Sequence, residues 1–439
     1  MPPKHKKGGR ESVSVDIFSN LPSDVTDAIL MCLPLRDIVR TSILSKRWRY
    51  KWCKLPELTL NLNHLETNDL IPPTLQFTNI MYHLLTLHVG PIIKFTLSIN
   101  IFLETCPVID NLIFFLSRNG IQHLVLQLPS NGKLPSLVFK CLQLRHLVIK
   151  YCLIVSPPAF EEFGRLISLE LSEVTISSKL VERLISNCSI LQKLVLKLWT
   201  LTNVVEIKAP MLRSFYFIGS IQYICFKNIP LLANVSLIDN ESSEKSSKCD
   251  ITNFFKSFVV LESLKLNEAS LKLFAAAAGG VPTRLPFHLK FVKSLRISSV
   301  ALDQQDEILC ALCLIRSCPY LEYMKIYKVS FFEEDSPAPP CLELEHLSDV
   351  MFSHLKEVKL QGFLATKAGM QLIKLLLDKS PVLVRMLIKP YIDDYDHSSL
   401  YESLTKIYSF LVVVKAFRRA SPNAEVAFDI EYDSDYDDL

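Results

Sequence analysis

One apolar phrase recurs through most of the chain and limits the folds that the chain can adopt. An apolar residue is followed by two variable residues, a second apolar residue, one variable residue and a third apolar residue. The copies are Ile92/Phe95/Leu97, Ile121/Leu124/Leu126, Leu144/Leu147/Ile149, Leu166/Leu169/Leu171, Leu191/Leu194/Leu196, Leu212/Phe215/Phe217, Leu232/Val235/Leu237, Leu261/Leu264/Leu266, Val292/Leu295/Ile297, Leu321/Met324/Ile326, Leu355/Val358/Leu360 and Leu383/Met386/Ile388. The spacing of about 20 to 35 residues is typical of a repeat protein.

Each copy of the phrase indicates a short strand whose inward side chains cannot be buried by that strand alone. Neighbouring copies must therefore stack into a curved parallel sheet with helices or loops behind it. This is the α/β solenoid of leucine-rich repeats. The chain has 439 residues, 49% of them hydrophobic, enough to fill such a core. The long concave face of a solenoid suits the recognition of proteins or peptides, and its shape does not indicate an active site.

The segment from residue 16 to residue 56 carries more apolar surface than a unit of its size can bury. Pro22 cannot extend a helix from the residues before it, so a helix is expected to begin just after Pro22. The expected helices cover Ser23–Leu33, Leu35–Ser42 and a third stretch with Leu44, Trp48 and Trp52 at helical spacing. The apolar residues fall on more than one helix face. The segment therefore predicts a partner protein that covers part of it.

The same segment resembles the F-box, in the form common in large plant F-box families. The resemblance rests on Leu21-Pro22, Ile29-Leu30, Leu33-Pro34, Val39, the run TSILSKRWR from Thr41 to Arg49, and Trp52. In that family the three-helix F-box docks on a Skp-type adaptor, which links it to the cullin and RING scaffold of a ubiquitin ligase. The resemblance implies that Trp48 supports the third helix. It also implies that the following residues face the adaptor: Leu21, Pro22, Ile29, Leu30, Leu33, Pro34, Val39 and Leu44.

The region from residue 354 to residue 419 resembles the FBD domain that closes many plant F-box and leucine-rich repeat proteins. A strand pattern leads to Gly362-Phe363, then to an amphipathic helix near Ala368–Asp378 and to Pro381–Ile388. A last helix is expected over about Ser399–Arg419. In physical terms this region is a cap that covers the open apolar end of the array.

The predicted order of domains follows from these segments. It is a disordered basic tail (1–15), the F-box (16–56), the leucine-rich repeat array (57–353), the FBD-type cap with its terminal helix (354–419) and a disordered acidic tail (420–439). Polar or proline-rich insertions at 241–248 and 333–340 are expected to be exposed loops.

A basic residue occupies the same place in four late copies of the phrase. The single residue between the last two apolar positions faces the concave side, and there it is Lys265, Arg296, Lys325 and Lys359. Adjacent strands lie about 4.8 Å apart, so the pattern predicts a ladder of like charges. One hypothesis is that the row binds an acidic segment, either of a substrate or of the chain's own tail. The other is a solvated basic strip beside a solvated acidic tail.

The sequence gives no support for an enzyme, a cofactor or a metal site. It contains no phosphate-binding glycine loop, nucleophile elbow or HExxH motif. Cys310 and Cys313 form a lone CxxC without the second ligand pair that zinc needs, so both are expected to be buried helix cysteines. The sequence contains twelve Cys, with neither a secretory signal nor an apolar run of membrane-spanning length. We therefore expect reduced thiols, a location in the cytoplasm, the nucleus or both, and no membrane partner.

The family resemblance implies a substrate-recognition subunit of a Skp-cullin-F-box type ubiquitin ligase. Its expected partners are the Skp-type adaptor, through it a cullin, and an unidentified protein substrate on the repeats. Two alternatives stay open. One is a scaffolding or nucleic-acid-binding repeat protein that uses the basic cluster at residues 36–54, although a net charge of +3 makes nucleic acid a weak expectation. The other is a receptor whose repeats bind a small anionic ligand.

Overall fold

The computed structural model describes most of the chain and divides it into two compact units. It describes residues 21–429 apart from 34, 47, 63–71, 100–106, 131, 156–162, 199–200, 202, 241–248, 277–279, 299, 302–304, 331–350, 364–366 and 391–399. The first unit is Met1–Leu144 and the second is Arg145–Leu439. The predicted basic tail and the insertions at 241–248 and 333–340 lie outside the described residues.

The first unit begins with short helical elements, and the expected third helix is not among them. The elements are α1 (Ser23–Met31), α2 (Leu35–Arg40) and two 3-10 turns, Thr41–Ile43 and Trp52–Lys54. Between the two turns the backbone forms further turns, with Trp48 N–H donating to the Ser45 carbonyl. Serine and threonine favour such turns because their hydroxyls compete for backbone groups. The Thr41 hydroxyl does so here, 2.6 Å from the Ile38 carbonyl oxygen.

The rest of the first unit is three parallel strands with two helices. The strands are β1 (Glu57–Asn61), β2 (Lys94–Ser98) and β3 (His123–Gln127), and the helices are α3 (Pro73–Leu87) and α4 (Pro107–Arg118). β2 pairs with β1 and with β3 in register, so that the phrase positions of the three strands align. β1 ends a copy of the phrase, Leu55/Leu58/Leu60, that the sequence prediction missed because it counted copies only from residue 92.

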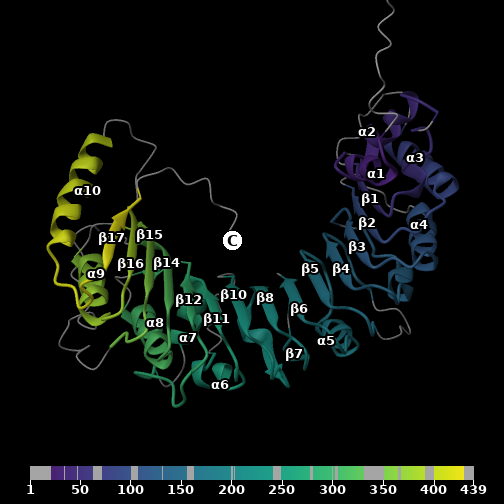
Figure 1. Cartoon of the computed structure of the whole chain (residues 1–439). Coiled ribbons are helices and arrows are strands. Elements are labelled where there is room, and N and C mark those ends of the chain that lie inside the picture. Colours follow the sequence, from purple (N-terminus) through teal and green to yellow (C-terminus); the bar gives the residue numbers. More distant parts are fainter. Residues whose placement is uncertain are drawn as a thin grey trace, which may run out of the picture. The chain divides into compact units, whose positions relative to one another are not determined.

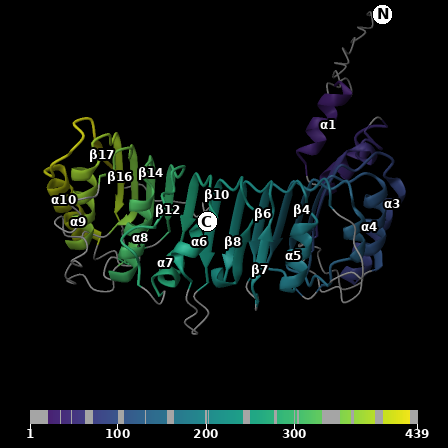
Figure 2. The same ribbon diagram turned by 90° about the horizontal axis from the view of Figure 1, so that it is seen from below.

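The second unit is built on a parallel sheet whose strands follow one another in chain order, with helices on its outer side (Figure 1). The strands are β4 (His146–Lys150), β5 (Ser168–Ser172), β6 (Lys193–Lys197), β8 (Ser214–Gly219), β10 (Asn234–Asp239), β11 (Ser263–Leu266), β12 (Ser294–Ile297), β14 (Tyr323–Ser330), β15 (Glu357–Phe363), β16 (Arg385–Pro390) and β17 (Glu425–Phe428). Figure 2 shows these strands side by side. Every predicted copy of the phrase ends in a strand, which confirms the α/β solenoid.

The apolar phrase forms the core of both units. All three apolar positions of each predicted copy are at most 4% exposed. Backbone hydrogen bonds hold the repeats in register, because the N–H groups of the first strand residue and of the residue before it donate to one carbonyl of the previous repeat. Glu322 and Tyr323, for example, both donate to the Lys293 carbonyl oxygen at 2.9 Å. Each buried side chain contributes about 1.5–3 kcal/mol, so stacking supplies the main stabilisation of the fold.

The outer side of the second unit varies from repeat to repeat. Helices cover several repeats, namely α5 (Ser178–Ser186), α6 (Ile251–Phe255), α7 (Glu268–Ala275) and α8 (Gln305–Ser317). Elsewhere a separate pair of short parallel strands, β7 (Val205–Lys208) and β9 (Ile224–Lys227), takes the place of a helix. From β9, Phe226 packs edge-on against Phe215, Phe254 and Phe258 at centroid distances of 5.1–5.7 Å.

The C-terminal elements extend the sheet further than the sequence predicted. α9 (Lys367–Lys379) separates β15 from β16, and α10 (Leu400–Lys415) leads to β17. The prediction of a disordered tail from residue 420 is wrong for residues 421–429, because β17 pairs with β16 over four residues. The turn before it is held by Ser421, whose buried hydroxyl donates to the Leu383 carbonyl oxygen at 2.7 Å. Residues 430–439 lie outside the described residues.

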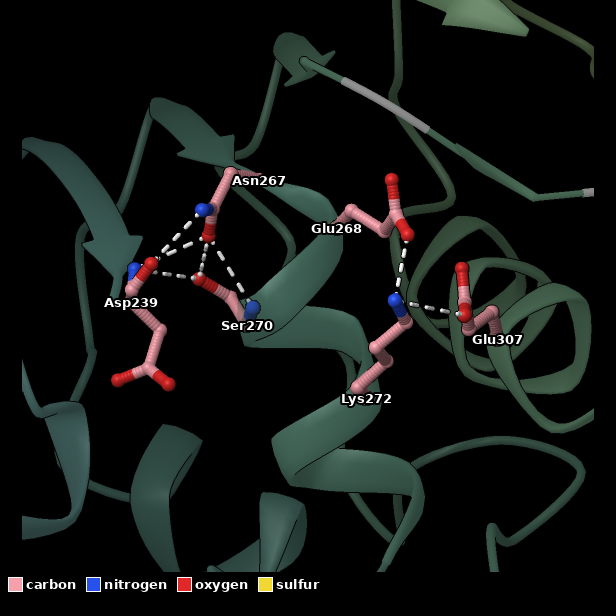
Figure 3. A network of polar contacts seen from close by, with 6 residues as sticks. All are labelled: Asp239, Asn267, Glu268, Ser270, Lys272 and Glu307. Carbon is pink, nitrogen blue, oxygen red and sulfur yellow. Dashed lines mark hydrogen bonds and ion pairs between the residues drawn. The ribbon is translucent and has the colours of Figure 1, made fainter. Parts of the chain in front are cut away.

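A side-chain network ties one strand end to the start of the next helix (Figure 3). Asn267 caps α7, and its Oδ1 accepts from the Ser270 N–H at 3.1 Å and from the Asp239 N–H at 3.0 Å. Its Nδ2 donates to the Asp239 carbonyl oxygen at 2.9 Å. On the same helix, Lys272 lies between Glu268 and the buried Glu307 of α8, 3.9 Å from the latter. The network therefore joins β10, α7 and α8.

Replacing Asn267 should destabilise the second unit. Asn267→Ala removes the acceptor of the Ser270 N–H, the donor to the Asp239 carbonyl oxygen and the shorter of two acceptors of the Asp239 N–H. We therefore expect the free energy of unfolding to fall by about 1–3 kcal/mol. Urea unfolding followed by circular dichroism measures this change. Asn253→Ala is the matched control, because Asn253 is exposed on α6 and bonds to the nearby Asp250 carboxylate. An effect of Asn267→Ala no larger than that of the control would contradict this role.

Candidate functional site

Helix α1 is positioned by contacts at its start and along one side. Pro22 precedes the helix with an extended backbone, and its carbonyl oxygen accepts from the Thr26 hydroxyl at 2.7 Å. Lys51 reaches back from the later turns to the Ser23 hydroxyl and the Asp27 carboxylate, at 3.3 Å from each. The Lys51 side chain is only 14% exposed. These bonds hold α1 against the turns that carry Trp48.

Large apolar side chains remain exposed on this N-terminal segment. They come from α1, from α2 and from the turns beside them, and we call them the apolar patch: Val25, Ile29, Met31, Leu33, Val39, Ile43 and Leu44, which are 38–87% exposed. So many large exposed apolar side chains on one short segment are typical of an interaction site. Sequence reasoning missed Val25, Met31 and Ile43 as members. Ile43 lies in a 3-10 turn, where helical spacing does not show which side chains point outward.

The residues predicted to face an adaptor are of three kinds: accessible to a partner, outside the described residues, or buried. Pro22, Ile29, Leu33, Val39 and Leu44 are exposed and Leu21 is half-buried, so a partner could reach them. Their contact with an adaptor stays a prediction. Pro34 lies outside the described residues.

The prediction that Leu30 faces a partner is wrong for this structure, because its side chain is 0% exposed. α1 has two apolar edges, and the edge with Leu30 is covered by the chain itself. Trp48 is also buried, at 4% exposed, which suits a supporting position.

The basic cluster at residues 36–54 is engaged in part with acidic neighbours. Lys51 pairs with Asp27, as described above, and Arg40 lies 3.3 Å from the Asp37 carboxylate. The side chains of Arg36 and Arg47 lie outside the described set. Nothing in the described part of this cluster distinguishes it as a nucleic-acid surface.

The predicted row of basic residues exists in the register of the sheet, and we call it the basic row. Lys265 on β11 stands opposite Arg296 on β12, which stands opposite Lys325 on β14. Lys325 in turn stands opposite Lys359 on β15. Each of these residues lies between two buried apolar positions, so its side chain points to the concave side. What the row binds stays a prediction.

Aromatic and acidic neighbours organise the middle of the basic row. The Tyr323 ring lies between Arg296 and Lys359, with both cationic groups 5.6 Å from its centroid. Lys359 also lies 3.2 Å from the Glu357 carboxylate on its own strand. Cation–π contacts of this kind contribute about 0.5–1 kcal/mol at exposed sites. The row is therefore an ordered part of the face.

The cysteines offer no metal site in the described part of the chain. Cys310 and Cys313 are buried on α8, as expected, and Cys318 follows that helix. Burial raises the pKa of the Cys313 thiol to about 11 and that of Cys318 to about 12. Among the described residues, no group of three or more His, Cys, Asp or Glu side chains could hold a metal ion. No described helix has the length and apolar content needed to cross a bilayer.

Comparison with known proteins agrees with this arrangement. A sequence model of the F-box domain matches residues 18–59. A model of the LRR repeats of the FBD-associated F-box protein At5g56370 matches residues 109–326. The F-box/FBD/LRR-repeat protein At1g13570 of Arabidopsis thaliana is 30% identical over 424 residues, which are 94% of this chain and 99% of that protein. The chain belongs to the F-box/FBD/LRR-repeat family.

Other plant F-box proteins match over different lengths. The probable FBD-associated F-box protein At1g32375 of Arabidopsis thaliana is 20% identical over 94% of this chain and 100% of its own length. The F-box/FBD/LRR-repeat protein At5g56420 of the same plant is 30% identical over 45% of this chain and 48% of its own. The resemblance to the plant family is thus confirmed. The apolar patch lies in its F-box, and the basic row begins in its repeats.

The buried thiols of this family member should resist alkylation in the native state. Only the thiolate reacts, and at pH 8 a thiol with a pKa of about 12 is ionised in about one molecule in ten thousand. We expect iodoacetamide at pH 8 to modify the exposed Cys32 and to leave Cys310, Cys313 and Cys318 intact until urea is added. Peptide mapping by mass spectrometry measures this. Modification of Cys318 as fast as Cys32 in the native chain would contradict the packing around α8.

Proposed function

We propose that this chain is the substrate-recognition subunit of a ubiquitin ligase of the Skp-cullin-F-box type. The F-box docks on a Skp-type adaptor, which connects the chain to a cullin. The repeats hold a protein substrate on their concave face. The observation that carries this proposal is the apolar patch, because it lies within the residues that match the F-box domain.

The apolar patch has the physical properties that docking on a shared adaptor requires. Ile43 and Leu44 are 87% and 67% exposed, and Val39 is 40% exposed. Burying side chains of this size contributes about 1.5–3 kcal/mol each, so a few of them suffice for a stable complex. The driving force is non-directional and depends little on salt. This distinguishes it from the electrostatic binding of a nucleic acid.

The chain's contribution to ubiquitin transfer is proximity. Proteins with an F-box and leucine-rich repeats are typically adaptors without catalytic activity, and we propose that this chain also supplies no catalytic residue. By holding the substrate and the ligase scaffold together, it raises the effective concentration of substrate lysines near the ubiquitin donor. We expect this complex to act in the cytoplasm, the nucleus or both.

Substitution of two exposed members of the apolar patch should abolish adaptor binding. Ile29→Asp with Leu44→Asp places two charges in an apolar contact, and we expect the affinity for a Skp-type adaptor to fall at least about a hundredfold. Co-expression and co-purification with the adaptor, followed by calorimetry, measures this change. Leu30→Asp is unsuitable, because Leu30 is buried and its substitution would unfold the segment.

The matched control is Val259→Asp, because Val259 is 66% exposed and belongs to the second unit and not to the F-box segment. It should bind the adaptor as the unaltered chain does, and all variants should keep the same circular dichroism spectrum. If the double variant co-purified with the adaptor as well as the control, the proposed function would fail.

Adaptor binding should also protect Cys32 from alkylation. Cys32 is exposed between Met31 and Leu33 of the apolar patch, so a docked partner would cover its thiol. We expect the rate of its modification by iodoacetamide to fall at least about tenfold in the complex. Cys225 on β9 is the internal control, since its rate should not change. Equal rates at Cys32 in the free and bound chain would place the adaptor elsewhere.

A further inference from the structure

The concave face of the second unit is strongly basic over the strands β11 to β16. Residues that share the face with the basic row are identified by the register of these strands. The basic residues are Lys265, Arg296, Lys325, Lys359, Arg385 and Lys389. The acidic residue in these strand positions is Glu357. The face therefore carries six formal positive charges against one negative charge.

The residues that follow the last strand have the opposite charge. The described chain reaches Asp429, the residue after β17, and the sequence continues as IEYDSDYDDL from 430 to 439. This acidic segment contains no Lys or Arg. Its acidic residues are Glu431, Asp433, Asp435, Asp437 and Asp438. The charge of this segment is thus complementary to that of the basic face.

The acidic residues also have the spacing that one-sided contact with a surface requires. Glu431, Asp433, Asp435 and Asp437 alternate with other residues, and in an extended chain every second side chain points to the same side. The alternation continues that of the concave-facing residues Glu425 and Ala427 of β17 and of Asp429, which follows the strand. An extended acidic segment would therefore present its carboxylates together.

The acidic segment is long enough to reach the whole basic row. β17 lies two strands from β15, which carries Lys359, and five strands from β11, which carries Lys265. At about 4.8 Å a strand, the two distances are roughly 10 Å and 24 Å. Ten extended residues span up to about 33 Å. A chain that turns back from β17 across the sheet can thus pass every member of the row.

We propose that residues 430–439 dock across the concave face on the basic row of the same molecule. Carboxylates laid beside side chains about 4.8 Å apart reduce the mutual repulsion of these charges. The short tether gives the segment a local concentration in the millimolar range, so weak individual ion pairs suffice. An acidic segment of another protein must then displace the tail to use this row. The inference does not depend on adaptor docking by the F-box.

Competition with a peptide in trans tests the proposal on the full chain. The probe is a fluorescent peptide of sequence IEYDSDYDDL. It is added to the unaltered chain and to a neutral-tail variant with Glu431→Gln, Asp433→Asn, Asp435→Asn, Asp437→Asn and Asp438→Asn. We expect fluorescence anisotropy to show binding to the neutral-tail variant that is at least about tenfold tighter than to the unaltered chain. The affinity for the variant should fall steeply with salt.

Two further variants locate the binding surface. In the neutral-tail background, Arg296→Glu with Lys325→Glu should weaken peptide binding at least about tenfold. Lys193→Glu with Lys197→Glu is the matched control, because it makes the same charge change on β6 of the same sheet. It should leave most of the affinity intact. Melting temperatures of both variants show whether the chain stays folded.

Each contrary outcome overturns a stated part of the proposal. If the peptide bound the unaltered chain and the neutral-tail variant equally, the tail would not occupy the row, and the row would be open to acidic segments of other proteins. If the Arg296 and Lys325 substitutions weakened binding no more than the control substitutions did, the basic row would not be the site. Loss of adaptor binding in the F-box variants affects neither result.

Discussion

The burial of each apolar phrase against the next is the interaction on which this structure depends. A single strand with three inward side chains has no core of its own, so every repeat is stabilised by its neighbours. The strands of the second unit accordingly follow chain order and pair in parallel, and their phrase positions are almost fully buried. Most residues that point to the concave side of the described strands lie outside this buried core. These residues are therefore free to vary with function.

The same constraint explains the irregular outer side. A repeat needs something behind its strand, but the identity of that element matters little as long as it covers the apolar phrase. Helix α8 does so with a long apolar face, whereas β7 and β9 do so with the ring of Phe226 and its neighbours. Spacing between phrases can therefore drift without loss of the sheet. Polar networks such as that of Asn267 then fix individual connections.

Much of the fold and part of the site could be predicted from the sequence, and the differences have physical causes. The phrase fixes both the strand and its register, which is why the alignment of Lys265 to Lys359 was predictable. β17 was missed because Asn423 stands where the first apolar residue of the phrase belongs, while Ser421 and Ala424 are buried in that turn. Leu30 was misplaced because periodicity shows two apolar edges on a helix but not which edge the chain covers.

A comparison of magnitudes explains how the sheet can carry a row of like charges. Each repeat buries three apolar side chains at about 1.5–3 kcal/mol each, whereas a like-charge pair on adjacent strands is unfavourable by roughly 0.2–1 kcal/mol. Burial exceeds the repulsion several-fold, so the basic row does not endanger the fold. An acidic chain that lies along the row relieves this repulsion, and the relief adds to its binding energy. The apolar patch on the F-box segment differs in its driving force. A partner that binds there gains free energy by removing apolar surface from water, and this gain is nearly independent of salt. One surface thus suits a partner shared by many related chains, and the other suits a partner selected by its charge.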